Sequence, residues 1–164
     1  MRNRDIIFGA AAGALGVWAM DRLDWALWDR QPEAVRRRIE EVRPGGLDPA
    51  HAIAHRAAAA LGHHLTPAQP HPAGLAVHYA AGALPAVAYA LARRRIPLLA
   101  AGGGLLYGLG AFLLEDEIGG PATGFAAPPQ AYPWQAHARG LVAHLLYGLV
   151  VESALRLLSG RPGR

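Results

Sequence analysis

The sequence IPLLAAGGGLLYGLGAFLL, residues 96–114, decides the fold of this chain. It runs for nineteen residues without a charged side chain or a histidine. An α-helix needs roughly 20 apolar residues to cross a hydrocarbon core about 30 Å thick. A helix on the surface of a soluble bundle would carry polar residues at a period of 3.6, and this run carries none. We therefore predict that it crosses a membrane.

Three further runs have the length and apolar character of membrane spans. Residues 72–92 carry no charged side chain and one histidine, His78. The first run, residues 6–20, spans a bilayer if its helix continues to the tryptophans Trp25 and Trp28, which suit a membrane interface. We predict an all-α, polytopic membrane protein, a four-transmembrane-helix bundle forming one membrane domain over residues 1–164, with spans at about 6–28, 72–92, 96–114 and 134–158.

The first run also has the features of a secretory signal peptide, since Arg2 and Arg4 precede fifteen uncharged residues. A cleaved signal would be followed by a polar mature start. Here the chain continues into residues 21–28, Asp-Arg-Leu-Asp-Trp-Ala-Leu-Trp, whose tryptophans favour an interfacial position. We expect a retained anchor.

Arginine supplies all of the basic charge, because the chain holds no lysine and its formal net charge is +4. With four spans, the arginines of the N-terminus, of residues 93–95 and of the C-terminus share one side of the membrane: Arg2, Arg4, Arg93, Arg94, Arg95, Arg156, Arg161 and Arg164. The positive-inside rule assigns that side to the cytoplasm. The opposite connection, residues 115–133, holds three acids and no base. We predict a multi-pass protein of the bacterial inner (cytoplasmic) membrane with both termini cytoplasmic.

Residues 29–71 form a long polar segment on the outer side of this topology. Their six arginines run against the positive-inside rule, so the side of this segment stays open. Strong helix formers predict a helix over residues 32–42, which Pro44-Gly45-Gly46 ends. Asp48 can cap a second helix that begins at Pro49 and runs to Ala60. We expect a small helical cap.

Ionisable groups inside the spans are the candidates for function, because they are costly in lipid and usually face the bundle interior or a water-filled cavity. In the fourth span His137, His144 and Glu152 share one face of a helix that turns by ~100° per residue. The topology places further acids and His78 toward the outer leaflet. We predict a polar intramembrane site from these residues: His78, His144, Glu152, His137, Asp21, Asp24 and Glu115.

Three interpretations of this site remain open. Its imidazoles and carboxylates can hydrogen-bond across helices and fix their register. They can handle protons, since an unperturbed histidine has a pKa of about 6.5. His78 and His144 can also face each other as axial ligands of haem. The sequence predicts no cofactor and leaves haem and metal as alternatives.

A second group of histidines lies in the outer segment. His51 and His55 are four residues apart on the second predicted cap helix, and Asp48 lies three residues before His51. Side chains at this spacing share one helix face. The His-Glu-x-x-His motif is absent and the other ligands are undefined. His51 and His55 are therefore weak candidates for metal ligands.

Absent motifs exclude several classes of function. The chain has no cysteine, which removes thiolate catalysis and thiolate metal sites. It lacks a phosphate-binding loop, a nucleophile elbow and an aromatic-and-basic surface for nucleic acid. We predict that the protein is not an enzyme and is an accessory or structural membrane component. The alternatives are a small transporter or proton-handling protein and a haem- or metal-binding membrane protein. Its expected partners are the lipid bilayer and a second copy or another membrane protein.

The C-terminal part of the chain resembles a known family. Residues 128–134, Pro-Pro-Gln-Ala-Tyr-Pro-Trp, precede His144, and Glu152 follows eight residues after that histidine. The second span adds His78, with Tyr89 eleven residues later. This series is similar to the YagU-like family of bacterial inner-membrane proteins of unknown function. The resemblance covers roughly the second to fourth spans and implies a multi-span inner-membrane protein in which His78, His144 and Glu152 stand out.

Overall fold

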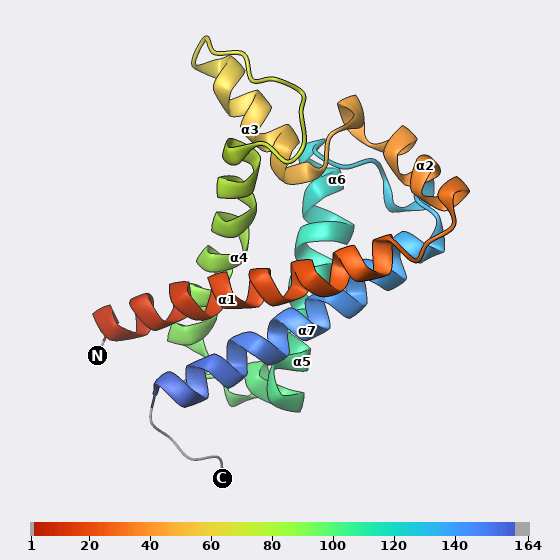
Figure 1. Ribbon diagram of the computed structural model, residues 1–164. Coiled ribbons are helices and arrows are strands. Elements are labelled where there is room, and N and C mark those ends of the chain that lie inside the picture. The colour runs from red at the N-terminus through yellow and green to blue at the C-terminus, as the bar shows by residue number, and fades with distance from the viewer. Residues whose placement is uncertain (1, 160–164) are drawn as a thin grey trace.

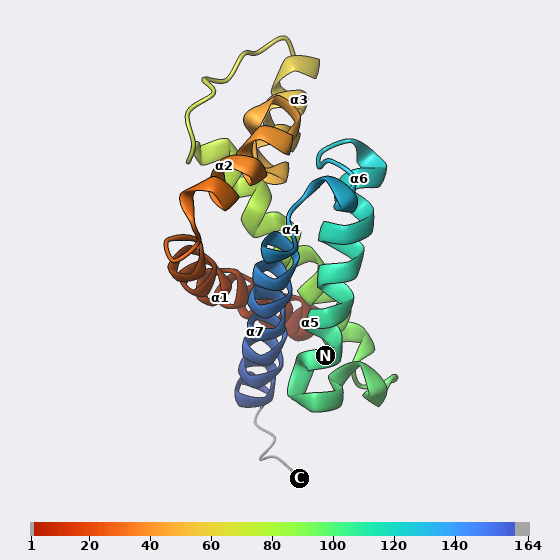
Figure 2. The same cartoon turned by 90° about the vertical axis from the view of Figure 1, so that its right-hand side faces the viewer.

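The chain folds entirely into helices and loops over residues 2–159, which the computed structural model describes. The α-helices are α1 (Arg2–Trp28), α2 (Glu33–Val42), α3 (Pro49–Ala60), α4 (Pro72–Ala92), α5 (Leu105–Phe112), α6 (Gly120–Thr123) and α7 (Trp134–Leu158). In Figure 1, α1 and α7 run side by side in opposite directions, and α4 and α5 cross this pair. Figure 2 shows α2, α3 and α6 gathered at one end of the molecule.

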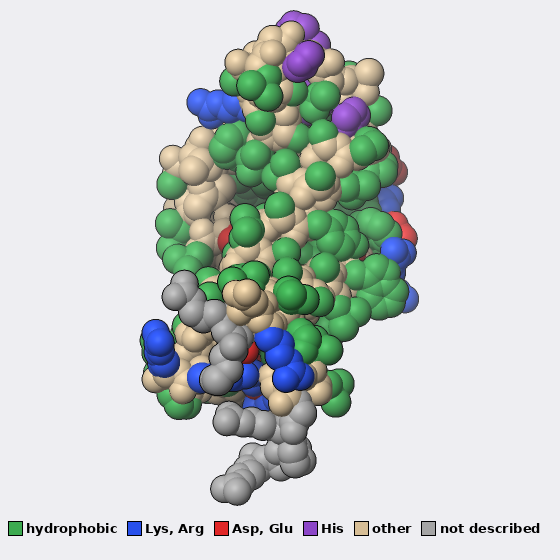
Figure 3. All heavy atoms as spheres, turned by 90° about the vertical axis from the view of Figure 1, so that its left-hand side faces the viewer, with side chains coloured by type: hydrophobic (Ala, Val, Ile, Leu, Met, Phe, Trp, Pro, Cys, Tyr) green, Lys and Arg blue, Asp and Glu red, His purple; other side chains and the backbone are tan. Residues whose placement is uncertain are grey.

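Four helices are long and apolar enough to cross a membrane: Asn3–Trp28, Pro72–Ala92, Pro97–Thr123 and Trp134–Leu158. Many large apolar side chains on these helices are exposed, including Leu84, Leu114 and Leu157. Figure 3 shows hydrophobic side chains over the middle of the molecule, with arginines gathered at the lower end and histidines at the upper end. The predicted all-α four-helix bundle is confirmed, and its apolar exterior fits a multi-pass membrane protein.

The third span differs from the regular helix that its composition suggests. Its start, Pro97–Gly104, is 3₁₀-helical and is interrupted at Ala101, Gly102 and Gly103. Three successive glycines, Gly102 to Gly104, have φ between 64° and 104°, a backbone conformation that other residues rarely adopt. After α5 the chain continues as a π-helix, Leu113–Gly119, into α6. The helical segment therefore ends at Thr123, beyond the expected boundary at residue 114.

Small residues let the long helices approach closely. A Cβ added at Gly9 would lie 2.7 Å from the Cα of Val87, and one added at Gly13 would lie 2.8 Å from the Cα of Ala83. These two glycines thus bring α1 against the backbone of α4.

The outer segment forms the two helices that the sequence predicts. The side chain of Asp48 caps α3 by accepting a hydrogen bond from the His51 amide at 3.0 Å. The His51 ring is buried against Gly74 at the start of α4, and its Nε2 accepts the His71 amide hydrogen at 2.8 Å. This contact docks the cap onto the second span.

Candidate functional site

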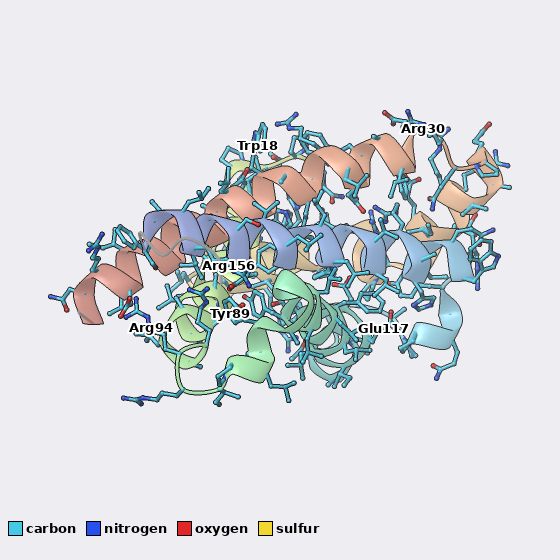
Figure 4. The ribbon with its side chains drawn as sticks, turned by 90° about the horizontal axis from the view of Figure 1, so that it is seen from below. Trp18, Arg30, Tyr89, Arg94, Glu117 and Arg156 are labelled. Atoms are coloured by element: carbon cyan, nitrogen blue, oxygen red, sulfur yellow. The ribbon has the colours of Figure 1, made fainter. Side chains whose placement is uncertain are left out.

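Glu152 is the centre of a buried charge cluster, the Glu152 cluster, formed with Tyr89, Arg93 and Arg156. Its carboxylate is 1% exposed and accepts hydrogen bonds from Tyr89 at 2.6 Å, Arg93 at 2.5 Å and Arg156 at 2.6 Å. Tyr89 and Arg93 lie one turn apart at the end of α4, whereas Arg156 lies one turn after Glu152 on α7. Figure 4 shows Tyr89 and Arg156 close together where α4 meets α7. Two guanidinium groups therefore compensate one buried carboxylate.

Arginine side chains gather at the lower end of the molecule in Figure 3. Arg94 forms an ion pair with Asp5 at 3.0 Å, which ties the end of α4 to the start of α1. Arg4 donates to the carbonyl of Leu158 at 3.3 Å and ties the start of α1 to the end of α7. The start of α1 and the ends of α4 and α7 thus lie together on the arginine-rich side. Arg161 and Arg164, predicted on the same side, lie outside the described residues.

Toward the other end of the bundle, α1 contributes two acids that pair across helices. Asp21 is 9% exposed, and its Oδ1 lies 2.8 Å from Nε2 of His78 on α4. Asp24 forms an ion pair with Arg139 on α7. Both acids and His78 were predicted as site residues from the sequence, whereas Arg139 was not. Arg139 could have been found as a charged side chain inside the fourth apolar run.

The two histidines of α7, His137 and His144, contact partners on α7 itself and on residues 116–129. Nδ1 of His137 lies 2.6 Å from Glu117, and its Nε2 donates to the carbonyl of Pro129 at 3.0 Å. Nδ1 of His144 donates to the Gly140 carbonyl of its own helix at 2.9 Å and lies 3.6 Å from Asp116.

Within residues 2–159, His144 makes no hydrogen bond or ion pair with the acids of the first span, Asp21 and Asp24. His144 turns toward Asp116 because the π-helix Leu113–Gly119 brings that acid to the face of α7. Glu115, the remaining candidate, lies half-buried beside Asp116 on the same π-helix.

Three tyrosines, Tyr89, Tyr107 and Tyr147, pack in the interior of the bundle between the Glu152 cluster and His144. The hydroxyl of Tyr107 lies 2.9 Å from that of Tyr147, which donates to the Gly82 carbonyl at 2.6 Å. The Tyr107 ring stacks on Tyr89, with ring centroids 4.1 Å apart, and Tyr89 bonds Glu152. Sequence reasoning missed this tyrosine series as part of the site, although all three residues lie within apolar runs.

Arginines and tryptophans meet near the C-terminal end of α1 and the N-terminal end of α7. Arg43 and Arg139 lie 5.8 and 5.1 Å from the ring centroid of Trp28, and Arg22 lies 4.8 Å from that of Trp25. The pKa of Arg43 lies below its ordinary value, because burial lowers it more than the neighbouring Asp48 raises it. The contact between Arg43 and Trp28 joins the cap to the bundle at the tryptophan-rich end of α1.

The weak metal candidates do not form one site in this fold. Nε2 of His51 accepts the His71 amide hydrogen, and its Nδ1 lies 2.7 Å from Asp48. His55 instead lines a cavity beside α3. Within residues 2–159, no group of three or more His, Asp or Glu side chains is arranged to hold a metal ion. The two imidazoles considered for haem, His78 and His144, have protein partners, Asp21 and Gly140.

Comparison of this chain with known protein families, with curated proteins and with solved structures finds no match.

Proposed function

We propose that this chain is an accessory or structural component of the bacterial inner membrane, without catalytic activity. The observation that carries the proposal is the pairing of ionisable groups between helices. Asp21 pairs with His78, Asp24 with Arg139, and Glu152 with Arg93, so α1, α4 and α7 are joined to one another. In lipid such contacts hold helices in one arrangement.

The Glu152 cluster favours a structural role over transport. A transported proton or ion needs a carboxylate that exchanges its partners during the cycle. Glu152 accepts hydrogen bonds from three side chains, two of them arginines, and is 1% exposed. Opening this cluster would leave charges unpaired in a buried site, which is costly.

Topology is the first test of the membrane part of the proposal. With both termini in the cytoplasm, the thiol of Ala57→Cys on α3 reacts with a membrane-impermeant maleimide added to intact cells. The thiol of Ser159→Cys reacts only after permeabilisation. The chain has no cysteine of its own, so each label reports one position. The reverse labelling pattern would place the arginine-rich end outside and refute the proposed orientation.

A second candidate, a proton-handling protein, is favoured by the tyrosine series. Tyr147, Tyr107 and Tyr89 occupy the interior between the His144 region and Glu152, and hydroxyls can pass protons along hydrogen bonds. The bond from Tyr147 to the Gly82 carbonyl argues against this role, because a carbonyl accepts a hydrogen bond but passes on no proton. We therefore favour the structural role.

Liposomes that contain the purified protein and an internal pH-sensitive dye separate the two candidates. For a structural component we expect the parent to leak protons no faster than empty liposomes under an imposed membrane potential. Proton flux that is lost in Glu152→Gln but kept in the exposed neighbour Ser153→Ala would overturn the structural proposal. Size-exclusion chromatography of each variant checks that the bundle is intact.

A further inference from the structure

A cavity of about 410 Å³ lies at the outer end of the molecule, within the size range of small-molecule sites. It lies between α3 and the segment that follows α6. Its lining comes from three separate parts of the chain: Pro44, Leu47, Ala52, His55, Arg56, Ala59, His63, His64, Leu65, Gly124 and Phe125. We name it the cap cavity.

The ionisable lining of the cap cavity is basic. It consists of Arg56 and three histidines, and no lining residue is an aspartate or a glutamate. A guanidinium group matches the geometry of carboxylate and phosphate groups. Nε2 of His55 is shielded and has no hydrogen-bond partner within residues 2–159. A buried polar atom without a partner is rare, and a ligand oxygen could supply one.

The rest of the lining is apolar. Leu47, Leu65 and Phe125 contribute side chains, and the Arg56 guanidinium lies 5.3 Å from the Phe125 ring centroid. With its face on an aromatic ring, a guanidinium can direct the N–H groups of its edge to a carboxylate or phosphate. The cavity thus combines a place for an anionic group with a place for an apolar body.

We propose that the cap cavity binds an organic anion, a carboxylate or phosphate group joined to an apolar body. The same chemistry occurs in water-soluble ligands and in anionic lipids. Arg56 holds the anionic group, and Leu47, Leu65 and Phe125 contact the apolar part. This binding site is independent of the structural role proposed above.

Phenyl phosphate is a suitable probe, because it carries both chemical features and dissolves in water. We titrate it calorimetrically into the full chain in phosphatidylcholine nanodiscs, with empty nanodiscs as the blank. We expect saturable binding at one site per chain, with inorganic phosphate at least about tenfold weaker because it leaves the apolar lining unused. Benzyl alcohol, which lacks the charge, should show no saturable binding.

Variants test the role assigned to Arg56. Arg56→Gln should weaken phenyl phosphate binding at least about tenfold through loss of a charge-assisted hydrogen bond. Arg56→Lys, which keeps the charge, should retain more affinity than Arg56→Gln. Arg37→Gln is the matched control, since Arg37 is exposed on α2 and pairs with Glu33 of its own helix. Should Arg56→Gln not fold, Leu65→Glu places an acid in the lining and should also weaken binding at least about tenfold.

Nanodiscs with added phosphatidylglycerol identify the source of the anion. Weaker apparent binding of phenyl phosphate in them means that an anionic lipid competes for the cavity, and unchanged binding means a water-soluble ligand. The proposal is overturned if phenyl phosphate does not saturate, if inorganic phosphate binds as tightly, or if folded Arg56→Gln and Leu65→Glu bind like the parent.

Discussion

Glu152→Ala should lower the free energy of unfolding by about 3–5 kcal/mol, because it leaves the arginines around a buried carboxylate without their partner. Arg93 is the more affected of the two, since 14% of its side chain is exposed, against 46% for Arg156. The Tyr89 hydroxyl also loses its acceptor. Unfolding of purified protein in mixed micelles, followed by circular dichroism, measures the loss.

Ser153→Ala is the control for this measurement, since Ser153 is the next residue on α7 and is exposed. Its free energy of unfolding should stay within about 0.5 kcal/mol of the parent value. A Glu152→Ala protein as stable as Ser153→Ala would mean that the Glu152 cluster does not hold α4 to α7.

Gly148→Val should have the second large effect, because α5 and α7 meet backbone to backbone at this position. A Cβ added at Gly148 would lie 2.7 Å from the amide nitrogen of Gly108 and 2.8 Å from its Cα. Backbone atoms cannot turn aside as a flexible side chain can. We expect a loss of about 3 kcal/mol or more in the free energy of unfolding, since overpacking of this kind forces helices apart.

Gly110→Ala supplies a matched comparison on the same helix as Gly108. A Cβ added at Gly110 would meet no atom within 4 Å. Its free energy of unfolding should be unchanged or up to about 1 kcal/mol higher, because alanine favours a helix more than glycine does. Equal stability of Gly148→Val and Gly110→Ala would contradict the close approach of α5 and α7.

The spans and cap helices could be predicted from the sequence because their signals are local. A long, mostly apolar run marks each membrane helix, and two of these runs, residues 72–92 and 96–114, carry no charged side chain. In the cap, Asp48 and Pro49 mark the start of α3 within the same short stretch, and the observed helix is Pro49–Ala60. The irregular start of the third span escaped prediction, because glycines can join an apolar helix or interrupt it. Their positive φ values occur where Gly103 and Gly104 lie against α7, a contact that the local sequence does not reveal.

The membership of the candidate site was largely predictable, whereas its pairing was predictable only in part. The position of Glu152 at the arginine-rich end of its span favours Arg93 or Arg94 as its partner, and the structure pairs it with Arg93. An ionisable group in or beside an apolar run can be recognised from the sequence alone, so Asp21, His78 and Glu152 were predicted as site residues. The partner of Glu152 lies on a helix about sixty residues earlier in the chain, at Arg93 and Tyr89. Only the way α4 crosses the bundle brings them together.

The sequence by itself determined that this protein has four apolar helices, a helical cap and a set of ionisable groups that lipid cannot solvate. The tertiary structure decided which of those groups compensate one another, how His144 comes to face Asp116, and that Arg56 and Phe125 line one open cavity. The physical reason is the distance along the chain over which each interaction acts. Hydrophobicity and helix capping act within a few residues, but an ion pair or a cavity depends on surfaces that meet only after the helices pack.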